Sequence, residues 1–380
     1  MRTGTLEPRK VIQQLRDEHP PVEDRVGKVR LDMNENTAGA APGVVRVARR
    51  AVTGKRLATY PEYDVARAAL ARHFQVSPQE LLVTNGIDDA IKLLCDTFVD
   101  AGDTLLIPAL TFPMYQFFHS VAGGKTMVVH HNENLGLPLD RVLTALGQKR
   151  GRGRPSVRWL ALANPNNPTG TIIPEADLKV ILRAAPGALV LVDEAYFEYS
   201  GETVLPCIRR FPNLVVSRTF SKAYGLAGLR LGLLFARREL IGWMRRAQAV
   251  FPVNSIALAT AVEGVRNPDP IRQHVEQVQR NRDRLCQCLD SLGVPYVPSA
   301  ANFVFACFGE RAPRIARRLT EQGILVRHWS GDPYLRPYFR LGIGTTPETR
   351  RLIHALNSLG SLIKPPDPRS AWRGVTEYSP

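Results

Sequence analysis

The sequence has few of the features that mark secreted, membrane-spanning and metal-binding proteins. It contains five cysteines in 380 residues, spread along the chain without a CxxC pair, and its eight histidines show no metal-ligand spacing. This pattern argues against a disulfide framework and a zinc site, so we expect free thiols and no metal. The apolar runs are far too short to span a membrane, and residues 1–5 are not followed by the apolar segment of a secretory signal. We therefore expect a cytoplasmic protein without a membrane partner.

Acidic residues are also scarce, with 35 Asp and Glu against 50 Lys and Arg, which gives a formal net charge of +15. A basic protein of this kind can bind nucleic acid. The basic residues are dispersed, however, and the sequence has no helix-turn-helix, zinc-finger or RNA-binding signature. The densest basic cluster, residues 149–155, has the composition of a solvated loop. We therefore expect no nucleic-acid partner, and an anionic small-molecule substrate accounts more simply for the charge.

Strand-like and helix-like periodicity alternate over most of the chain, which predicts an α/β fold with a mainly parallel sheet. The expected strands are 104–107, 126–130, 157–163, 188–192, 213–217 and 229–235. The expected helices are 88–98, 114–121, 174–183 and 237–249.

Beyond about residue 256 the pattern is that of a smaller α+β domain. It predicts helices at 270–292, 313–321 and 347–359 and strands at 303–308, 324–326 and 339–343. We therefore expect an N-terminal arm that packs with the small domain, a large domain, the small domain and an extended, proline-rich tail. Their expected bounds are 1–45, 46–270, 271–363 and 364–380.

The most informative segment, residues 217–230, places Lys222 among hydroxyl and small side chains, eight positions before Arg230. A lysine that attacks a carbonyl needs a neutral amine, and a crowded site near a second cation lowers its pKa. The hydroxyls of Thr219 and Ser221 and the Arg230 guanidinium suit a phosphate. A cofactor with both an aldehyde and a phosphate, pyridoxal phosphate, fits this segment. The alternative for the segment alone is a surface lysine in a glycine-rich loop.

Two further segments follow expected strands, where an open α/β sheet binds its ligand. Asp193 ends an apolar strand and could pair with a protonated pyridine nitrogen, or could simply cap a helix. Asn167, in a turn rich in proline, could bind the phenolic oxygen of the cofactor, and Tyr196 could share that contact. The alternative for Asn167 is a plain turn.

Two other places carry candidate binding residues. Gly86, Ile87 and Asp88 lie where a short strand turns into a helix, which is either a phosphate site or ordinary helix capping. Arg340 lies in an apolar strand, where it either binds a substrate carboxylate or pairs with a protein acid.

Together these segments resemble fold-type I pyridoxal-phosphate enzymes of the class I and II aminotransferases, and within them the histidinol-phosphate aminotransferase-like group. The resemblance runs from about residue 31 to about residue 359. It rests on residues 31–36, Tyr60-Pro61, Asn85-Gly86, 164–170, 193–196, Ser221-Lys222, 228–230, Asn302-Phe303 and Arg340.

The resemblance implies the aspartate aminotransferase-like fold, with a mainly parallel seven-stranded sheet and a smaller α+β domain. It implies transfer of an amino group between an amino acid, or an amine such as histidinol phosphate, and a 2-oxo acid. It also makes Lys222 the Schiff-base lysine, Asp193 the partner of the ring nitrogen, and Asn167 and Tyr196 the partners of the phenolic oxygen. The residues that it assigns to the cofactor phosphate are Gly86, Ile87, Asp88, Thr219, Ser221 and Arg230.

The same resemblance implies that Tyr115 stacks on the cofactor ring and that Tyr60 reaches the phosphate in the other subunit of a homodimer. Arg340 then binds the substrate carboxylate, Arg327 a second anionic group, and Asn36 another part of the substrate.

The chain departs from the family after Asn36, where residues 37–40 replace a proline, an aromatic residue and a Gly-Pro pair. The aromatic residue normally covers the far end of the substrate. The alternative is therefore a specialised pyridoxal-phosphate lyase, cyclase or decarboxylase that acts on an amino acid in secondary metabolism. A second alternative, of another class, is a basic nucleic-acid-binding protein.

Overall fold

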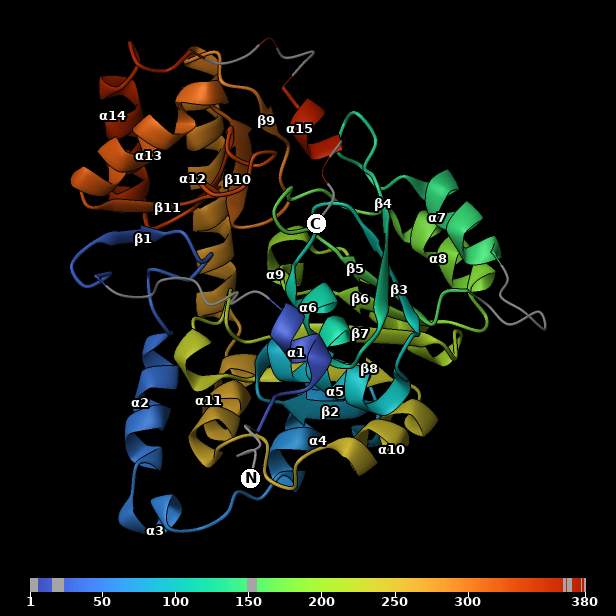
Figure 1. The fold of residues 1–380 in the computed structure, drawn as a ribbon. Coiled ribbons are helices and arrows are strands. Elements are labelled where there is room, and N and C mark those ends of the chain that lie inside the picture. The colour runs from blue at the N-terminus through green and yellow to red at the C-terminus, as the bar shows by residue number, and fades with distance from the viewer. Residues whose placement is uncertain are drawn as a thin grey trace, which may run out of the picture.

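The computed structural model describes residues 6–15, 24–148, 156–364, 367, 371–376 and 378. These residues form a large α/β part and a smaller α+β part, and the 23-residue helix α12 (Asp269–Ser291) runs along both (Figure 1). Residues 149–155, where we expect a solvated basic loop, lie outside the described residues. In the described ranges, no helix has both the length and the hydropathy that crossing a bilayer requires.

The large part is built on a seven-stranded sheet. Its strands are β2 (Leu81–Thr84), β3 (Thr104–Pro108), β4 (Lys125–Val129), β5 (Trp159–Ala163), β6 (Leu189–Asp193), β7 (Leu214–Thr219) and β8 (Gly232–Ala236). They lie in the order β2-β8-β7-β6-β5-β3-β4, and only β8 runs antiparallel to its neighbours. The expected α/β fold with a mainly parallel seven-stranded sheet is confirmed.

Helices cover both faces of this sheet, which is why its central strands are apolar on both sides. In β5, Trp159 and Ala161 pack with the helices of one face, whereas Leu160 and Leu162 pack with those of the other. The first face carries α5 (Gly86–Phe98), α6 (Met114–Val121) and α10 (Arg238–Ala247). The second carries α4 (Asp64–His73), α7 (Leu139–Gly147), α8 (Glu175–Ala184) and α11 (Ser255–Arg266).

The small part contains a five-stranded sheet in the order β1-β11-β12-β10-β9. These strands are β1 (Val29–Leu31), β9 (Tyr296–Val297), β10 (Phe303–Cys307), β11 (Ile324–His328) and β12 (Tyr338–Gly342). Helices α13 (Ala312–Glu321) and α14 (Thr346–Ser358) accompany α12 here. Strand β1 pairs in parallel with β11, with Val29 opposite Ile324, so the N-terminal arm contributes a strand to the small sheet.

Shorter elements connect these layers. The remaining helices are α1 (Lys10–Gln14), α2 (Pro42–Ala51), α3 (Gly54–Leu57), α9 (Phe197–Ser200) and α15 (Arg373–Thr376). Turns of 3-10 helix lie at Pro78–Glu80, Leu205–Arg209, Ala227–Leu229 and Gly309–Arg311.

Two expectations about elements are wrong. The strand expected at 229–235 begins only at Gly232, because Arg230 has a φ of 53° and interrupts the extended backbone. The tail expected to be extended contains α15, and its residue Ala371 is buried and accepts a hydrogen bond from the Tyr338 hydroxyl at 2.8 Å. The proline content of the tail gave no sign of this packing. The division into domains at residues 45, 270 and 363 stays our proposal.

Candidate active site

The residues expected to bind a cofactor meet at one edge of the large sheet. Asp193 is the last residue of β6, Thr219 is the last residue of β7, and Lys222 follows in the next loop. Asn167 lies in the loop after β5. Because parallel strands end at the same edge, segments that are far apart in the sequence converge here.

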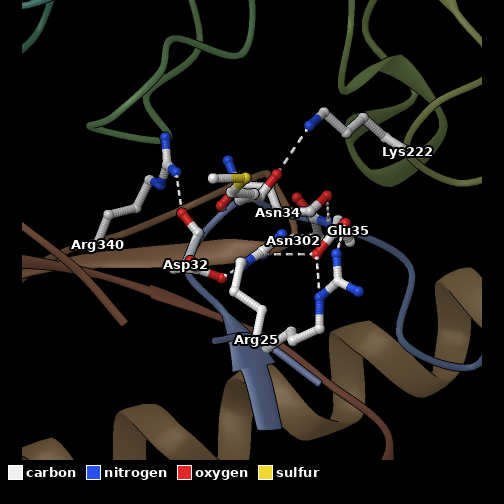
Figure 2. A network of polar contacts seen from close by, with 9 residues as sticks. Arg25, Asp32, Asn34, Glu35, Lys222, Asn302 and Arg340 are labelled. Carbon is white, nitrogen blue, oxygen red and sulfur yellow. Dashed lines mark hydrogen bonds and ion pairs between the residues drawn. The ribbon is translucent and has the colours of Figure 1, made fainter. Parts of the chain in front are cut away.

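Lys222 extends from its loop toward residues 32–35 of the N-terminal arm, as Figure 2 shows. Its Nζ donates a hydrogen bond to the Met33 carbonyl oxygen at 3.0 Å. Burial and, after it, the Arg340 cation lower the pKa of Lys222 to about 8, although the Glu35 carboxylate acts in the opposite direction. A lysine with this pKa carries a substantial neutral fraction near pH 8, which a nucleophile or base requires.

Asp193 is a buried carboxylate with two hydroxyl partners. The Tyr115 hydroxyl donates to Oδ2 at 2.6 Å, and the Ser217 hydroxyl donates to Oδ1 at 2.8 Å. Burial raises the pKa of Asp193, while these two hydrogen bonds act in the opposite direction. An acid in this position can hold the proton of a cofactor ring nitrogen. Tyr115 is itself fully buried, and the stacking expected of it stays a prediction.

The turn from β2 into α5 has the shape and charge of a cradle that would suit an anion. Gly86 begins α5 with a φ of +82°, and a Cβ there would lie 2.5 Å from an Nη atom of Arg230. Arg230 donates to the Asp88 carboxylate at 3.2 Å, which holds its guanidinium beside the first turn of α5. The N-cap residue, Asn85, makes no capping hydrogen bond through its side chain. Free N–H groups, a positive helix end and a guanidinium together suit a phosphate.

Thr219 and Ser221 lie next to this cradle. Thr219 is paired with Gly232 across β7 and β8. Gly232 in turn lies against Gly86, because a Cβ added to Gly232 would be only 2.7 Å from the Gly86 carbonyl carbon. The Thr219 hydroxyl oxygen accepts a hydrogen bond from the Ser221 N–H at 3.1 Å. The structure thus brings Thr219 and Gly86 together, although the sequence separates them by more than 130 positions.

Arg340 enters the site from β12 of the small sheet. Its two Nη atoms donate to Asn167 Oδ1 and to the Asp32 carbonyl oxygen, both at 2.6 Å, and its buried Nε has no hydrogen-bond partner within the described ranges. Burial lowers the pKa of Arg340 to about 10. Among the residues that the structure describes, no acid forms an ion pair with Arg340, so the expected alternative of an internal ion pair is not seen. A buried cation that forms no ion pair with a described acid is suited to bind an anion.

Tyr196 and Asn34 add a second buried polar contact. Asn34 Nδ2 donates to the Tyr196 hydroxyl oxygen at 2.9 Å, and Asn302 Nδ2 donates to the Asn34 carbonyl oxygen at 3.1 Å. The amide oxygens of Asn34 and Asn302 are buried, and no donor from the described part of the chain reaches them. The contacts expected between the phenolic oxygen and Tyr196 or Asn167 stay predictions.

The residues expected to bind substrate are placed in different ways. Arg327 lies opposite Arg340 across β11 and β12. The Asn36 side chain donates to the Ala223 carbonyl oxygen and accepts from the Ala38 N–H, both at 3.0 Å. Both ends of the Asn36 amide therefore bind backbone, and its substrate contact stays a prediction, as does that of Arg327.

Tyr60 lies on the surface of the chain. Its side chain is 78% exposed and stacks on Phe251, with 4.2 Å between ring centroids and 13° between ring planes. Its expected contact with a second subunit stays a prediction.

Several contacts in this site had no clear signal in the sequence. The carbonyl oxygens of Asp32 and Met33 bind Arg340 and Lys222, and main-chain contacts leave no trace in a side-chain pattern. Ser217 has a signal in the sequence, because it is a polar residue in an apolar strand. The structure adds that Ser217 lies opposite Asp193 across β6 and β7.

The site as a whole fits pyridoxal phosphate. It offers an amine with a lowered pKa, a buried acid at the end of a strand, and an anion cradle that a Cβ at Gly86 would fill. Lys222, Asp193 and the Gly86–Arg230 cradle are the groups that would hold the aldehyde carbon, the ring nitrogen and the phosphate.

Known proteins are similar to this chain in sequence and in fold. Residues 26–356 match the family model for aminotransferase class I and II. The chain is 35% identical to a histidinol-phosphate aminotransferase of Caldanaerobacter subterraneus subsp. tengcongensis, over 89% of this chain and 95% of that protein. It is 34% identical to one of Symbiobacterium thermophilum, over 87% and 90% of the two chains.

A solved structure is also similar. The histidinol-phosphate aminotransferase of Sinorhizobium meliloti in complex with pyridoxal-5'-phosphate has a TM-score of 0.85 and is 26% identical, over 95% of this chain and 100% of that chain. The protein therefore belongs to the class I and II aminotransferases, enzymes that depend on pyridoxal phosphate.

Proposed function

We propose that this aminotransferase takes its amino group from an amino acid, or from an amino-acid-like amine such as histidinol phosphate, and passes it to a 2-oxo acid in amino-acid biosynthesis. One observation carries the proposal. Lys222 and Arg340 bind the adjacent carbonyl oxygens of Met33 and Asp32, so the reactive amine and an anion-binding guanidinium face the same turn of backbone. Relatives named histidinol-phosphate aminotransferase support this choice of amine.

The residues divide the chemistry among them. Pyridoxal phosphate, when bound, supplies an aldehyde that bonds an amine and a ring that stabilises negative charge on the neighbouring carbon. Lys222, with its pKa of about 8, would take the proton from the substrate Cα and donate it to the carbon that the cofactor aldehyde contributes, because a proton returned to Cα would leave the amino group on the substrate. Asp193 keeps the ring nitrogen protonated through a carboxylate that Tyr115 and Ser217 hold in place.

Arg340 orients the substrate. Its planar fork suits a carboxylate, and Arg327 lies opposite it in the small sheet. Two neighbouring guanidinium groups suit a doubly charged phosphate, which histidinol phosphate carries in place of an α-carboxylate. This pairing supports an amine that bears a phosphate over a neutral one.

We also propose that the enzyme is a cytoplasmic homodimer. Near Tyr60 and Phe251 in the sequence, the side chains of Leu57, Val65 and Val250 are also exposed, and the stacking of Tyr60 on Phe251 brings the two segments together. A patch of exposed apolar side chains is typical of a surface that another protein chain covers. A second copy of the chain would cover it and would bring Tyr60 toward a neighbouring cofactor phosphate.

A half-reaction screen tests the proposed substrate. Cofactor-loaded enzyme is mixed with one amine at a time, including histidinol phosphate, aromatic amino acids and arginine, while the visible spectrum of the cofactor and the oxo product are followed. We expect histidinol phosphate to convert the cofactor to its amine form with an equal amount of oxo product. If no amine changed the cofactor spectrum, transamination would be contradicted. Release of ammonia or carbon dioxide would favour a lyase or decarboxylase.

A further inference from the structure

We propose that Arg25 is a positioning residue of the active site, because it fixes the turn of residues 32–35 that binds the catalytic groups. We call this segment the arm turn. The inference rests on the roles that the proposed function gives to Lys222 and Arg340. Arg25 touches neither of them, and nothing in its sequence context connects it with the site.

The arm turn contacts three functional side chains at once. The carbonyl oxygens of Asp32 and Met33 accept from Arg340 at 2.6 Å and from Lys222 at 3.0 Å. The Asn34 side chain donates to the Tyr196 hydroxyl oxygen at 2.9 Å. A shift of the arm turn would therefore move the partner of the base and the partner of the anion-binding arginine together.

The arm turn needs support from its surroundings. Asn34 has a φ of 54° and is only 2% exposed. Asparagine adopts this left-handed conformation more readily than most residues other than glycine, but the conformation still costs energy that contacts with neighbouring groups can offset. Asn302 holds it from the inside, through its hydrogen bond to the Asn34 carbonyl oxygen.

Arg25 holds the arm turn from the outside. One of its Nη atoms donates to Asp32 Oδ1 at 2.7 Å and to Glu35 Oε2 at 2.9 Å, so a single guanidinium ties together the first and last residues of the turn (Figure 2). Arg25 is 8% exposed, so water competes little for these bonds. Among the described residues, the partner of Arg30 is Glu35: the Arg30 side chain donates to both Glu35 carboxylate oxygens, and it is 42% exposed. Arg25 is thus the arginine that closes the turn.

Three variants of the cofactor-loaded full chain test the proposal. Arg25→Met removes the guanidinium, and Arg25→Lys keeps a cation that can reach one carboxylate. Arg209→Met is the matched control, because Arg209 forms a two-bond ion pair with Glu80 at the opposite edge of the large sheet. The measurements are hydrogen exchange of the peptide that contains residues 29–36, kcat and KM with histidinol phosphate, and Tm.

We expect Arg25→Met to speed hydrogen exchange in the arm turn, to lower kcat through Lys222 and to raise KM through Arg340. A displacement of about 1 Å can cost roughly 100-fold in rate, so we expect kcat/KM to fall by about 10- to 100-fold. Arg25→Lys should recover part of the loss. Arg209→Met should lower Tm without changing exchange in the arm turn or the kinetic constants.

The proposal is overturned if Arg25→Met folds and exchanges in the arm turn at the wild-type rate, or if it loses no more activity than Arg209→Met. If Arg25→Met does not fold, the same criteria apply to Arg25→Lys. If the wild-type enzyme transaminates no amine, the proposed function fails, and hydrogen exchange alone still decides whether Arg25 fixes the turn.

Discussion

Lys222 owes its ionisation to groups from distant parts of the sequence. Burial and the cations of Arg340 and Arg230 lower its pKa, and the carboxylates of Glu35 and Asp88 raise it. The sequence predicts a reactive lysine near Arg230, because both lie in one short segment. It does not predict the influence of Arg340 or Glu35, because these come from the small sheet and the N-terminal arm.

The lowered pKa can be tested through Arg340. Replacing Arg340 by Met removes a cation that disfavours the charged amine, so the pKa of Lys222 should rise from about 8 toward its ordinary value of 10.5. The measurement is the pH dependence of Lys222 labelling by an amine-selective reagent in cofactor-free protein, read by mass spectrometry. The Arg209→Met variant should keep the wild-type midpoint, and an unchanged or lower midpoint in Arg340→Met would contradict this account.

The same pKa shift affects stability in a definite direction. Folding lowers the pKa of Lys222, so the unfolded chain binds more protons between about pH 8 and 10.5. The contribution of Lys222 to the free energy of unfolding therefore rises with pH across this window. Wild-type protein should show this gain relative to Lys222→Met when urea unfolding of the cofactor-free forms is compared at pH 8 and pH 10. An equal change in both proteins would count against it.

Asp193 and Ser217 differ in how directly they act. Asp193→Asn removes the charge that we propose keeps the ring nitrogen protonated, and we expect kcat to fall by roughly 100-fold or more. Ser217→Ala removes only a hydrogen bond to Asp193 and should cost much less. Steady-state kinetics of both variants, with the cofactor spectrum as a check on loading, measure the difference. Equal losses in the two variants would mean that Asp193 acts mainly through packing.

At the scale of elements, most of the large sheet can be read from the sequence because its strands are apolar on both faces and alternate with helices. Helix α6 has the expected bounds, and β3, β6 and β7 lie within two residues of expectation. The first residues of the expected strand at 229–235 lie outside β8, because Arg230 takes a left-handed backbone conformation that periodicity does not reveal. That conformation brings its guanidinium to Gly86.

The turn between β2 and α5 makes a prediction at this scale. In Gly86→Ala, the new Cβ meets Arg230 and the residue must keep a φ of +82°, so we expect a loss of about 1 kcal/mol or more in stability. Displacement of Arg230 should also weaken cofactor binding by about tenfold, which corresponds to about 1.4 kcal/mol. Gly147→Ala, at a glycine with open space around it at the end of α7, is the matched control. Urea unfolding and cofactor titration measure both effects, and equal behaviour of the two variants would refute the cradle.

At the scale of the whole molecule, the site belongs to neither sheet alone. The large sheet supplies Lys222 and Asp193, the small sheet supplies Arg340, and the N-terminal arm supplies the carbonyl oxygens between them. The sequence indicates each of these side chains separately, because each one lies at the end of an expected strand or inside an apolar strand. Their distances depend on how the two parts pack, which local patterns do not encode.

The proposed dimer predicts complementation between two inactive variants. Lys222→Ala lacks the reactive amine, and Tyr60→Ala lacks the side chain proposed to reach the other subunit's phosphate. In a symmetric dimer, a mixed pair has one site with both residues intact, so unfolding and refolding an equal mixture should restore roughly a quarter of the wild-type activity. The measurement is activity before and after mixing, with each variant refolded alone as the control. If verified mixed dimers recovered no activity, Tyr60 would act in the site of its own subunit or would not belong to an active site.

The pairing of β1 with β11 has a consequence for the newly made chain. Val29 lies opposite Ile324, so the first strand of the small sheet leaves the ribosome about 300 residues before its partner. At about 5–20 residues per second, it waits roughly 15–60 s without a neighbour. During that interval the large sheet can assemble, while the arm stays open to chaperones and proteases. The catalytic pocket is therefore among the last features to close during biosynthesis.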